Sequence, residues 1–174
     1  AGNFKTAHRK GVDFLSGYCA VKPAPADIVI TTNGGYPLDQ NAYQCPKGMS
    51  AAEATVNDGG VIIMLATCQD GHGGESYYHS IADAESADAF FQQCLHTPQV
   101  ETLPDQWCAQ IWCRIVRKYK VLFVADKAQE QLIRDLKVEY FETLDEAYAR
   151  ARELKGPDAT LTCIPNGVSV VVKD

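Results

Sequence analysis

The sequence predicts a three-layer α/β domain, with a mostly parallel sheet and helices on both of its faces. Three short apolar runs, at 27–32, 61–67 and 120–125, lack the alternation of a half-exposed strand and fit strands buried on both faces. Helix-like segments separate these runs, as is typical of parallel sheets. The length of 174 residues suits one domain, and no linker or repeat divides it. We therefore predict a single Rossmann-like α/β domain over residues 1–174.

Three helices are predicted in the first third of the chain. Apolar residues recur at helical spacing over 4–19. Asp39 is placed to cap a helix over 39–49, and Pro46 within that helix predicts a bend. Ser50, followed three residues later by a glutamate, fits the capping box of a short further helix.

The rest of the chain continues the alternation of helices and strands. In chain order, we expect helices over 83–96, 105–119, 127–136 and 143–155, and strands over 138–141, 160–165 and 168–172. This order supplies enough helices to cover both faces of the sheet.

Charge and composition exclude several classes of protein. The chain has 16 Lys and Arg against 22 Asp and Glu, a net charge of −6, whereas nucleic-acid binders usually present a basic face. The densest basic stretch, 114–120, lies at a predicted helix end, where cations complement the helix dipole. The longest apolar run, 61–66, is far shorter than the roughly 20 residues of a membrane span. We expect neither a nucleic-acid nor a membrane partner.

The cysteines indicate a reducing compartment. Their number, seven, is odd, their spacing is irregular, and no C-x-x-C motif occurs. We expect mostly buried thiols in a cytoplasmic protein rather than a disulfide framework. The chain opens without Met and enters a helical pattern within four residues, as a piece of a longer polypeptide or a chain with its tag removed would.

The clearest candidate for a binding site follows the first predicted strand. Ligands of open α/β sheets bind outside the carboxyl ends of the strands, where residues 32–47 lie. Tyr43 and Lys47 share a helix face that Gln44 also reaches, so a phenol, an ammonium and an amide could hold a carboxylate. A tight turn and a solvated helix face would account for the same residues. Trp107 could close such a pocket, although an aromatic at helical spacing is more often core.

The loop at 68–75, after the second strand, leaves several alternatives open. A G-x-G-x-x-S string from Gly71 nearly matches the dinucleotide fingerprint, but it lacks the last glycine and the acidic strand end expected downstream. Cys68 and His72 could form a nucleophile and base, or the loop could be shaped only by its backbone. Four residues could be metal ligands, although they match no standard zinc spacing: Cys68, Asp70, His72 and His79.

The longest motif points to a known family. Residues 33–41 read NGGYPLDQN and are followed by Tyr43, Gln44 and Lys47. This pattern closely resembles the carboxyl-terminal domain of nickel-dependent lactate racemases, which use a nickel-pincer nucleotide. Supporting matches are AHR at 7–9, SAAEA at 50–54, GGVII at 59–63, DGHGG at 70–74 and DQW at 105–107.

The resemblance implies a division of labour between two domains. An N-terminal domain, absent from this chain, holds the nickel-pincer nucleotide on a lysine and supplies the metal-ligating and acid–base histidines. The reaction takes a hydride from C2 of a 2-hydroxy acid and returns it to either face. The present domain binds no metal and closes over that cofactor.

The resemblance also assigns residues to the closed site. Gln44 and Lys47 are expected to be catalytic groups that hold the substrate carboxylate or the reacting oxygen, while Tyr43 and Trp107 complete the substrate pocket. Pro46 stands between Gln44 and Lys47, where a helix former is expected, so we predict a changed direction for the Lys47 side chain. Five residues are expected in loops close to the cofactor: Asn33, Gly34, Gly35, Gly71 and His72.

Three hypotheses for the function follow. The first is the closing domain of a racemase or epimerase of lactate-like 2-hydroxy acids, inactive as an isolated chain. The second is a stand-alone α/β module that binds a small carboxylate or phosphate without catalysis. The third is a domain that only docks a partner.

Overall fold

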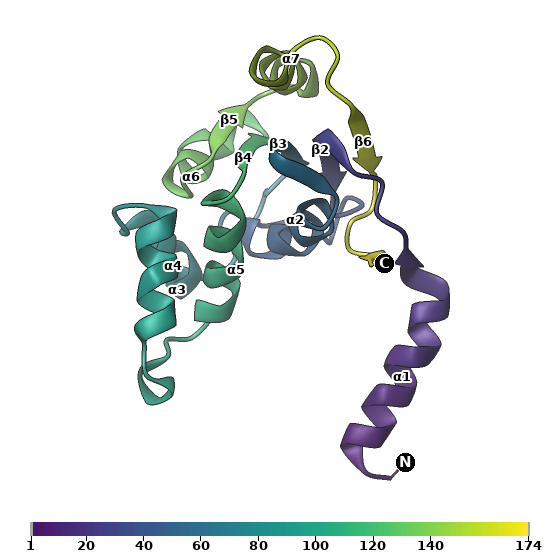
Figure 1. Ribbon diagram of the computed structural model, residues 1–174. Coiled ribbons are helices and arrows are strands. Elements are labelled where there is room, and N and C mark those ends of the chain that lie inside the picture. Colours follow the sequence, from purple (N-terminus) through teal and green to yellow (C-terminus); the bar gives the residue numbers. More distant parts are fainter. Residues whose placement is uncertain (1, 174) are drawn as a thin grey trace.

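The computed structural model describes residues 2–173 and has the predicted α/β architecture (Figure 1). One sheet has five strands in the order β5-β4-β3-β2-β6, and every neighbouring pair is parallel. These strands are β2 (Ala26–Thr32), β3 (Val56–Leu65), β4 (Lys120–Val124), β5 (Glu139–Phe141) and β6 (Leu161–Ile164). The predicted fold class is confirmed, including the three strands buried on both faces.

Helices cover the two faces of this sheet unequally. They are α2 (Cys45–Glu53), α3 (Glu75–Ala82), α4 (Ala87–His96), α5 (Gln106–Val116), α6 (Glu130–Asp135) and α7 (Leu144–Lys155). The chain steps from β2 to β5 in one direction, so right-handed crossovers put the helices between those strands on one face. The return to β6 puts α7 on the other face, as Figure 1 shows. There Ala147 and Ala151 pack against Ile28, Ile63 and Leu122 of the sheet.

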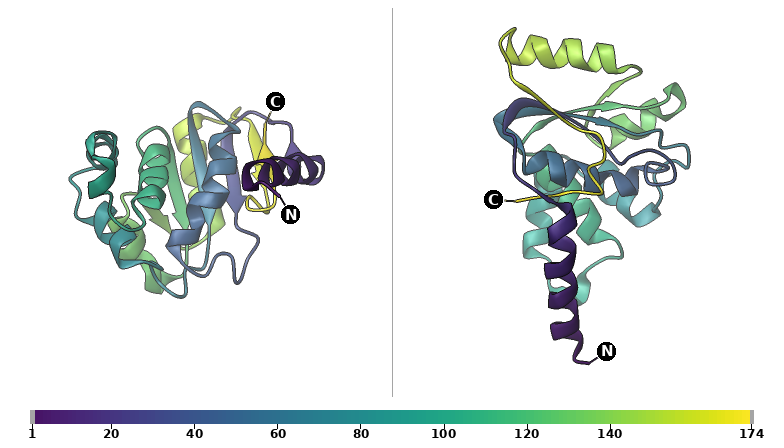
Figure 2. Two further views of the ribbon diagram at one scale, coloured as in Figure 1. Left: turned by 90° about the horizontal axis from the view of Figure 1, so that it is seen from below. Right: turned by 90° about the vertical axis from the view of Figure 1, so that its right-hand side faces the viewer.

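The first helix, α1 (Phe4–Cys19), extends away from the rest of the molecule (Figures 1 and 2). Asn3 caps it, since its side chain accepts hydrogen bonds from the backbone of Lys5 and Thr6. No residue of α1 is buried, although all sixteen lie in the described part of the chain. After α1, strand β1 (Ala20–Val21) pairs with β7 (Val171–Val172), which brings the two ends of the domain together.

The predicted helix over 39–49 is wrong in its start, and the predicted bend is absent. A 3-10 turn, η1 (Ala42–Gln44), leads into α2, which begins at Cys45. Pro46 lies in the first turn, where the helix needs no backbone N–H from it. Ser50 starts no new helix: it lies inside α2, and its hydroxyl donates to the carbonyl of Pro46 (2.7 Å).

Other differences concern the ends of elements. Helix α3 was not predicted, and the expected helix over 83–96 begins only at Ala87, where the Ser86 side chain accepts from the backbone of Ala89. The predicted strand 168–172 shrinks to β7. Within residues 2–173, no helix combines the length and apolar character that a membrane crossing requires.

The cysteines are free thiols, as expected. Four of them are buried in the core: Cys45, Cys68, Cys108 and Cys113. Burial raises the pKa of the Cys108 and Cys113 thiols to about 12. These two thiols are therefore inert core groups, whereas Cys163 is exposed.

Candidate active site

Asn33 fixes the segment that carries the predicted site. Its side chain is fully buried at the carboxyl end of β2. The amide nitrogen donates to the carbonyls of Leu38 (2.8 Å) and Gln44 (2.9 Å), and the amide oxygen accepts from the backbone of Gly48 (3.1 Å). Because these three bonds occupy the amide, Asn33 holds the loop in place instead of reaching a ligand. That this loop lies near a cofactor stays a prediction.

Gly34 and Gly35, which follow Asn33, both have positive φ angles, of 85° and 88°. A Cβ on Gly34 would lie 2.8 Å from the side chain of Asn166, and the positive φ strains any larger residue there. Gly35 faces open space and is part of the lining of a cavity described below. Glycine therefore shapes this turn as predicted.

Gln44 and Lys47 lie one turn apart at the start of α2 and contact each other. The Lys47 ammonium donates to the amide oxygen of Gln44 (2.5 Å), and Lys47 is exposed. Gln44 thus turns its amide nitrogen, a donor, away from the pair. The remaining hydrogens of both groups suit a carboxylate or another anion. The structure brings these two predicted residues together.

Tyr43 lies on η1, beside this pair, in an aromatic surrounding. Its ring meets Trp107 edge-on (centroids 6.1 Å apart) and Tyr77 likewise (5.4 Å). Its hydroxyl donates to the carboxylate of Asp105 (3.1 Å). Burial, the larger cause, and this hydrogen bond together raise the pKa of Tyr43 to about 12. Tyr43 is therefore a neutral phenol at physiological pH.

Trp107 is not a core residue. Its side chain is 57% exposed on α5, whereas Trp112, on the same helix, is fully buried. An exposed indole next to Tyr43 fits the predicted role of closing a pocket. Asp105, two residues earlier, is a member of this cluster that sequence reasoning missed. In the sequence it stood out only as the first residue of the DQW motif at 105–107.

The second predicted loop packs against the first through its backbone. Ala42 donates to the carbonyl of Gly71 and Tyr43 to that of His72, both at 3.0 Å. A Cβ on Gly73 would lie 2.4 Å from the Asn41 side chain, so the close approach of the two loops depends on glycine. The structure thus places Gly71 and His72 next to the Tyr43 segment.

Contacts of the loop side chains weigh against the alternative functions. The His72 ring stacks on Tyr78, with centroids 5.1 Å apart, and its Nδ1 accepts from the backbone of Gly74 (3.1 Å). Cys68 is fully buried, which does not suit a nucleophile. Glu75 in the first turn of α3 would repel a phosphate.

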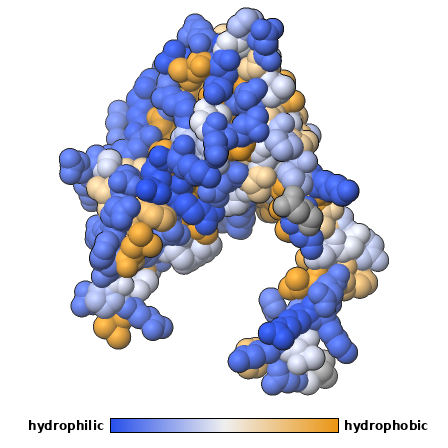
Figure 3. Space-filling view, in the orientation of Figure 1, coloured by the Kyte–Doolittle hydropathy of each residue, from blue (hydrophilic) through white to orange (hydrophobic). Residues whose placement is uncertain are grey.

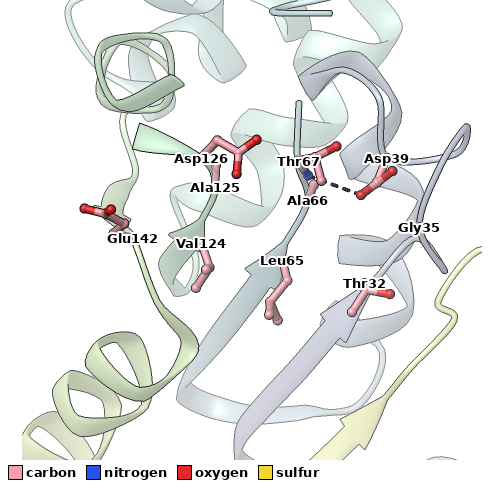
Figure 4. Close-up of a pocket in the computed structure, with 10 residues that line it drawn as sticks. All are labelled: Thr32, Gly35, Asp39, Leu65, Ala66, Thr67, Val124, Ala125, Asp126 and Glu142. Carbon is pink, nitrogen blue, oxygen red and sulfur yellow. Dashed lines mark hydrogen bonds between the residues drawn. The ribbon is translucent and has the colours of Figure 1, made fainter. Parts of the chain in front are cut away.

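A cavity of about 310 Å³ opens at the carboxyl edge of the sheet, as predicted for this fold class (Figure 4). Its charged lining residues are all acidic: Asp39, Asp126 and Glu142. One Asp39 oxygen accepts from the backbone of Thr67 (3.2 Å), and the other is buried without a partner among the described residues. Tyr43, Gln44, Lys47 and Trp107 do not line this cavity. A carboxylate substrate therefore suits the Lys47 side of the segment and not the cavity.

The described residues do not fit a nickel site. Within residues 2–173, no group of three or more His, Cys, Asp or Glu side chains is placed to hold a metal ion. In particular, the four ligands considered from the sequence form no such group. We assign no metal ligand to this chain.

Comparison with known proteins identifies the family of the chain. The family model described as the lactate racemase C-terminal domain matches residues 21–172. The chain belongs to this family. It is 48% identical over 173 residues to the lactate racemase of Lactiplantibacillus plantarum, covering 99% of this chain and 41% of that protein. It is 45% identical over 174 residues to the lactate racemase of Thermoanaerobacterium thermosaccharolyticum, again covering 41% of the relative.

A solved lactate racemase has the same fold. The structure of the lactate racemase apoprotein from T. thermosaccharolyticum superposes with a TM-score of 0.92 at 45% identity. The match covers 97% of this chain and 40% of that one. The chain thus spans about two fifths of the length of the lactate racemases that it matches.

Proposed function

We propose that this domain is the substrate-closing part of a 2-hydroxy-acid racemase or epimerase that uses a nickel-pincer nucleotide. Membership of the lactate racemase family supports the reaction class. The single observation that carries the site is the Lys47–Gln44 pair, exposed beside Tyr43 and Trp107. The pair offers N–H donors to an anion, as binding of a 2-hydroxy acid requires.

In this proposal, the residues of the chain bind and orient the substrate. The Lys47 ammonium and the Gln44 amide hold the carboxylate, and the Trp107 indole covers the site when the two parts of the polypeptide close. Closure removes water, which strengthens the ion pair between Lys47 and the substrate. The nickel-pincer nucleotide, held by the other domain, would supply the hydride acceptor.

The N-terminal remainder of the same polypeptide is the proposed partner. The apolar side chains of α1 are exposed, with Phe4 at 75%, Phe14 at 69% and Tyr18 at 77%. Figure 3 shows such side chains among polar ones along α1, which projects away from the sheet. A helix with an apolar side needs cover, and the relatives have more than twice the length of this chain.

Two further expectations stay predictions. They are that residues 1–174 form a single domain and that the protein is cytoplasmic.

The test uses the full-length polypeptide, purified from its source cells. We expect bound nickel by mass spectrometry of the metal content, and interconversion of D- and L-lactate or of a related 2-hydroxy acid by chiral chromatography. Bound nickel with activity on a longer hydroxy acid would leave the reaction class intact and change the substrate. A metal-free protein that racemises no member of a 2-hydroxy-acid panel would overturn the proposal.

Calorimetry with the same acids then examines the stand-alone binding module. Saturable binding by a metal-free, inactive protein would favour that module over the racemase.

A further inference from the structure

Asp105 has an unusual backbone and does not cap its helix. It precedes α5 with φ 61° and ψ 2°, a left-handed conformation that residues other than glycine rarely adopt. An aspartate at this position ordinarily accepts a hydrogen bond from the first turn of the helix, but the Asp105 side chain makes no such bond. Its carboxylate instead accepts the hydrogen bond of the Tyr43 hydroxyl. Residues held in sparsely populated backbone conformations cluster at functional sites.

This hydrogen bond determines what Tyr43 can offer to a ligand. A phenol has one proton, and here Asp105 accepts it. The oxygen of Tyr43 therefore presents only lone pairs to any other partner. Since Gln44 and Lys47 present N–H groups, the cluster combines donors for a carboxylate with one acceptor for a hydroxyl. A 2-hydroxy acid carries the two complementary groups on adjacent carbons.

We propose that Asp105 is a positioning residue that fixes the Tyr43 oxygen as the acceptor for the C2 hydroxyl of the substrate. The cluster would thereby select 2-hydroxy acids over carboxylates without that hydroxyl. This inference rests on the proposed function, and it assigns Asp105 no contact with the substrate.

Three variants separate this role from a structural one. Asp105→Gly removes the carboxylate, while glycine adopts the left-handed backbone without strain. Asp105→Asn keeps an acceptor oxygen and tolerates the same backbone, but it removes the charge. Tyr43→Phe removes the hydroxyl itself. Lys137→Gly is the matched control, because Lys137 also has a positive φ, of 65°, and lies in the turn before β5.

The experiment measures inhibition of lactate racemisation by two unreactive ligands in the full-length, nickel-loaded enzyme. 2-Hydroxy-2-methylpropanoate carries the C2 hydroxyl but no hydrogen on C2, and 2-methylpropanoate lacks the hydroxyl. In the unmodified enzyme, we expect the hydroxylated ligand to bind about tenfold more tightly, the contribution of one hydrogen bond in a closed site. The ratio of the two inhibition constants should fall to about one in Tyr43→Phe and Asp105→Gly, with no further loss in the double variant.

The remaining variants fix the interpretation. Asp105→Asn should keep most of the ratio, and Lys137→Gly all of it. A purely structural Asp105 would weaken both ligands equally and leave the ratio of their inhibition constants unchanged.

Two results would overturn the inference. One is a ratio near one in the unmodified, active enzyme, and the other is an unchanged ratio in Asp105→Gly. An unmodified enzyme that racemises no 2-hydroxy acid would instead overturn the proposed function, and the inference would fall with it.

Discussion

Two neighbouring regions of the molecule have opposite electrostatic character. The cavity at the carboxyl edge of the sheet is lined by Asp39, Asp126 and Glu142, while the adjacent cluster on η1, α2 and α5 exposes the Lys47 ammonium. Topology alone favours the cavity as the binding site, because ligands of open α/β sheets bind at that edge. The negative charge of the proposed substrate favours the Lys47 cluster instead. An anionic hydroxy acid is repelled by three carboxylates and attracted by an ammonium.

The largest expected effect comes from Lys47. In the proposed site, Lys47→Ala removes the cation that would face the substrate carboxylate after closure has excluded water. We expect kcat/KM of the full-length enzyme for lactate to fall by at least about a hundredfold, equivalent to roughly 3 kcal/mol.

Lys127→Ala is the matched control, because this exposed lysine belongs to the turn that follows Asp126 of the cavity and pairs with Glu130. Its removal should leave kcat/KM within about twofold, as for most exposed ion pairs. An equal loss in both variants would mean that the overall charge of the domain matters, and not the position of Lys47.

The sequence predicted the fold through its strongest patterns. The apolar runs of β2, β3 and β4 could be recognised because both of their faces are buried, so every residue carries the signal. The start of α2 could not be recognised in the same way. A proline such as Pro46 can either interrupt a helix or occupy its first turn, and the local pattern is the same for both. Only the preceding loop, anchored by Asn33, decides between these positions.

The candidate site shows the same limit. Tyr43, Gln44 and Lys47 were predicted from short spacings, because one turn of helix places them together whatever the rest of the fold. Asp105 lies 62 residues from Tyr43, so no local pattern could reveal their hydrogen bond. The exposure of Trp107 likewise depends on how α5 packs, which sets Trp107 and Trp112 on different sides of the helix.

A smaller effect, on stability, is expected from the segment that joins the two regions. Asn33 anchors residues 34–44, which contribute Asp39 to the cavity and Tyr43 to the cluster. Asn33→Ala leaves the part-buried carbonyls of Leu38 and Gln44 and the buried N–H of Gly48 without their partner. We expect a loss of about 3 kcal/mol in the free energy of unfolding, measured by urea denaturation.

Asn57→Ala is the control for this loss, because the Asn57 amide makes one hydrogen bond, to Asp27, in a half-buried position. It should cost about 1 kcal/mol or less. If Asn33→Ala were equally mild, water would be replacing the lost bonds, and the loop would not depend on Asn33.

The smallest effect is expected in the cavity itself. The double variant Asp126→Asn and Glu142→Gln neutralises two exposed carboxylates there and preserves their size. If the substrate binds at Lys47, the change acts on it only through solvent, where screening is strong, so kcat/KM for lactate should rise by less than about twofold at physiological salt. A loss of tenfold or more would show that these carboxylates take part in the reaction or its closure, and the separation of the two regions would be wrong. A strong gain that disappears at high salt would place the substrate closer to the cavity than the Lys47 cluster allows. The salt dependence of kcat/KM in this double variant thus shows whether the substrate binds at the Lys47 cluster or closer to the cavity, two regions that lie side by side.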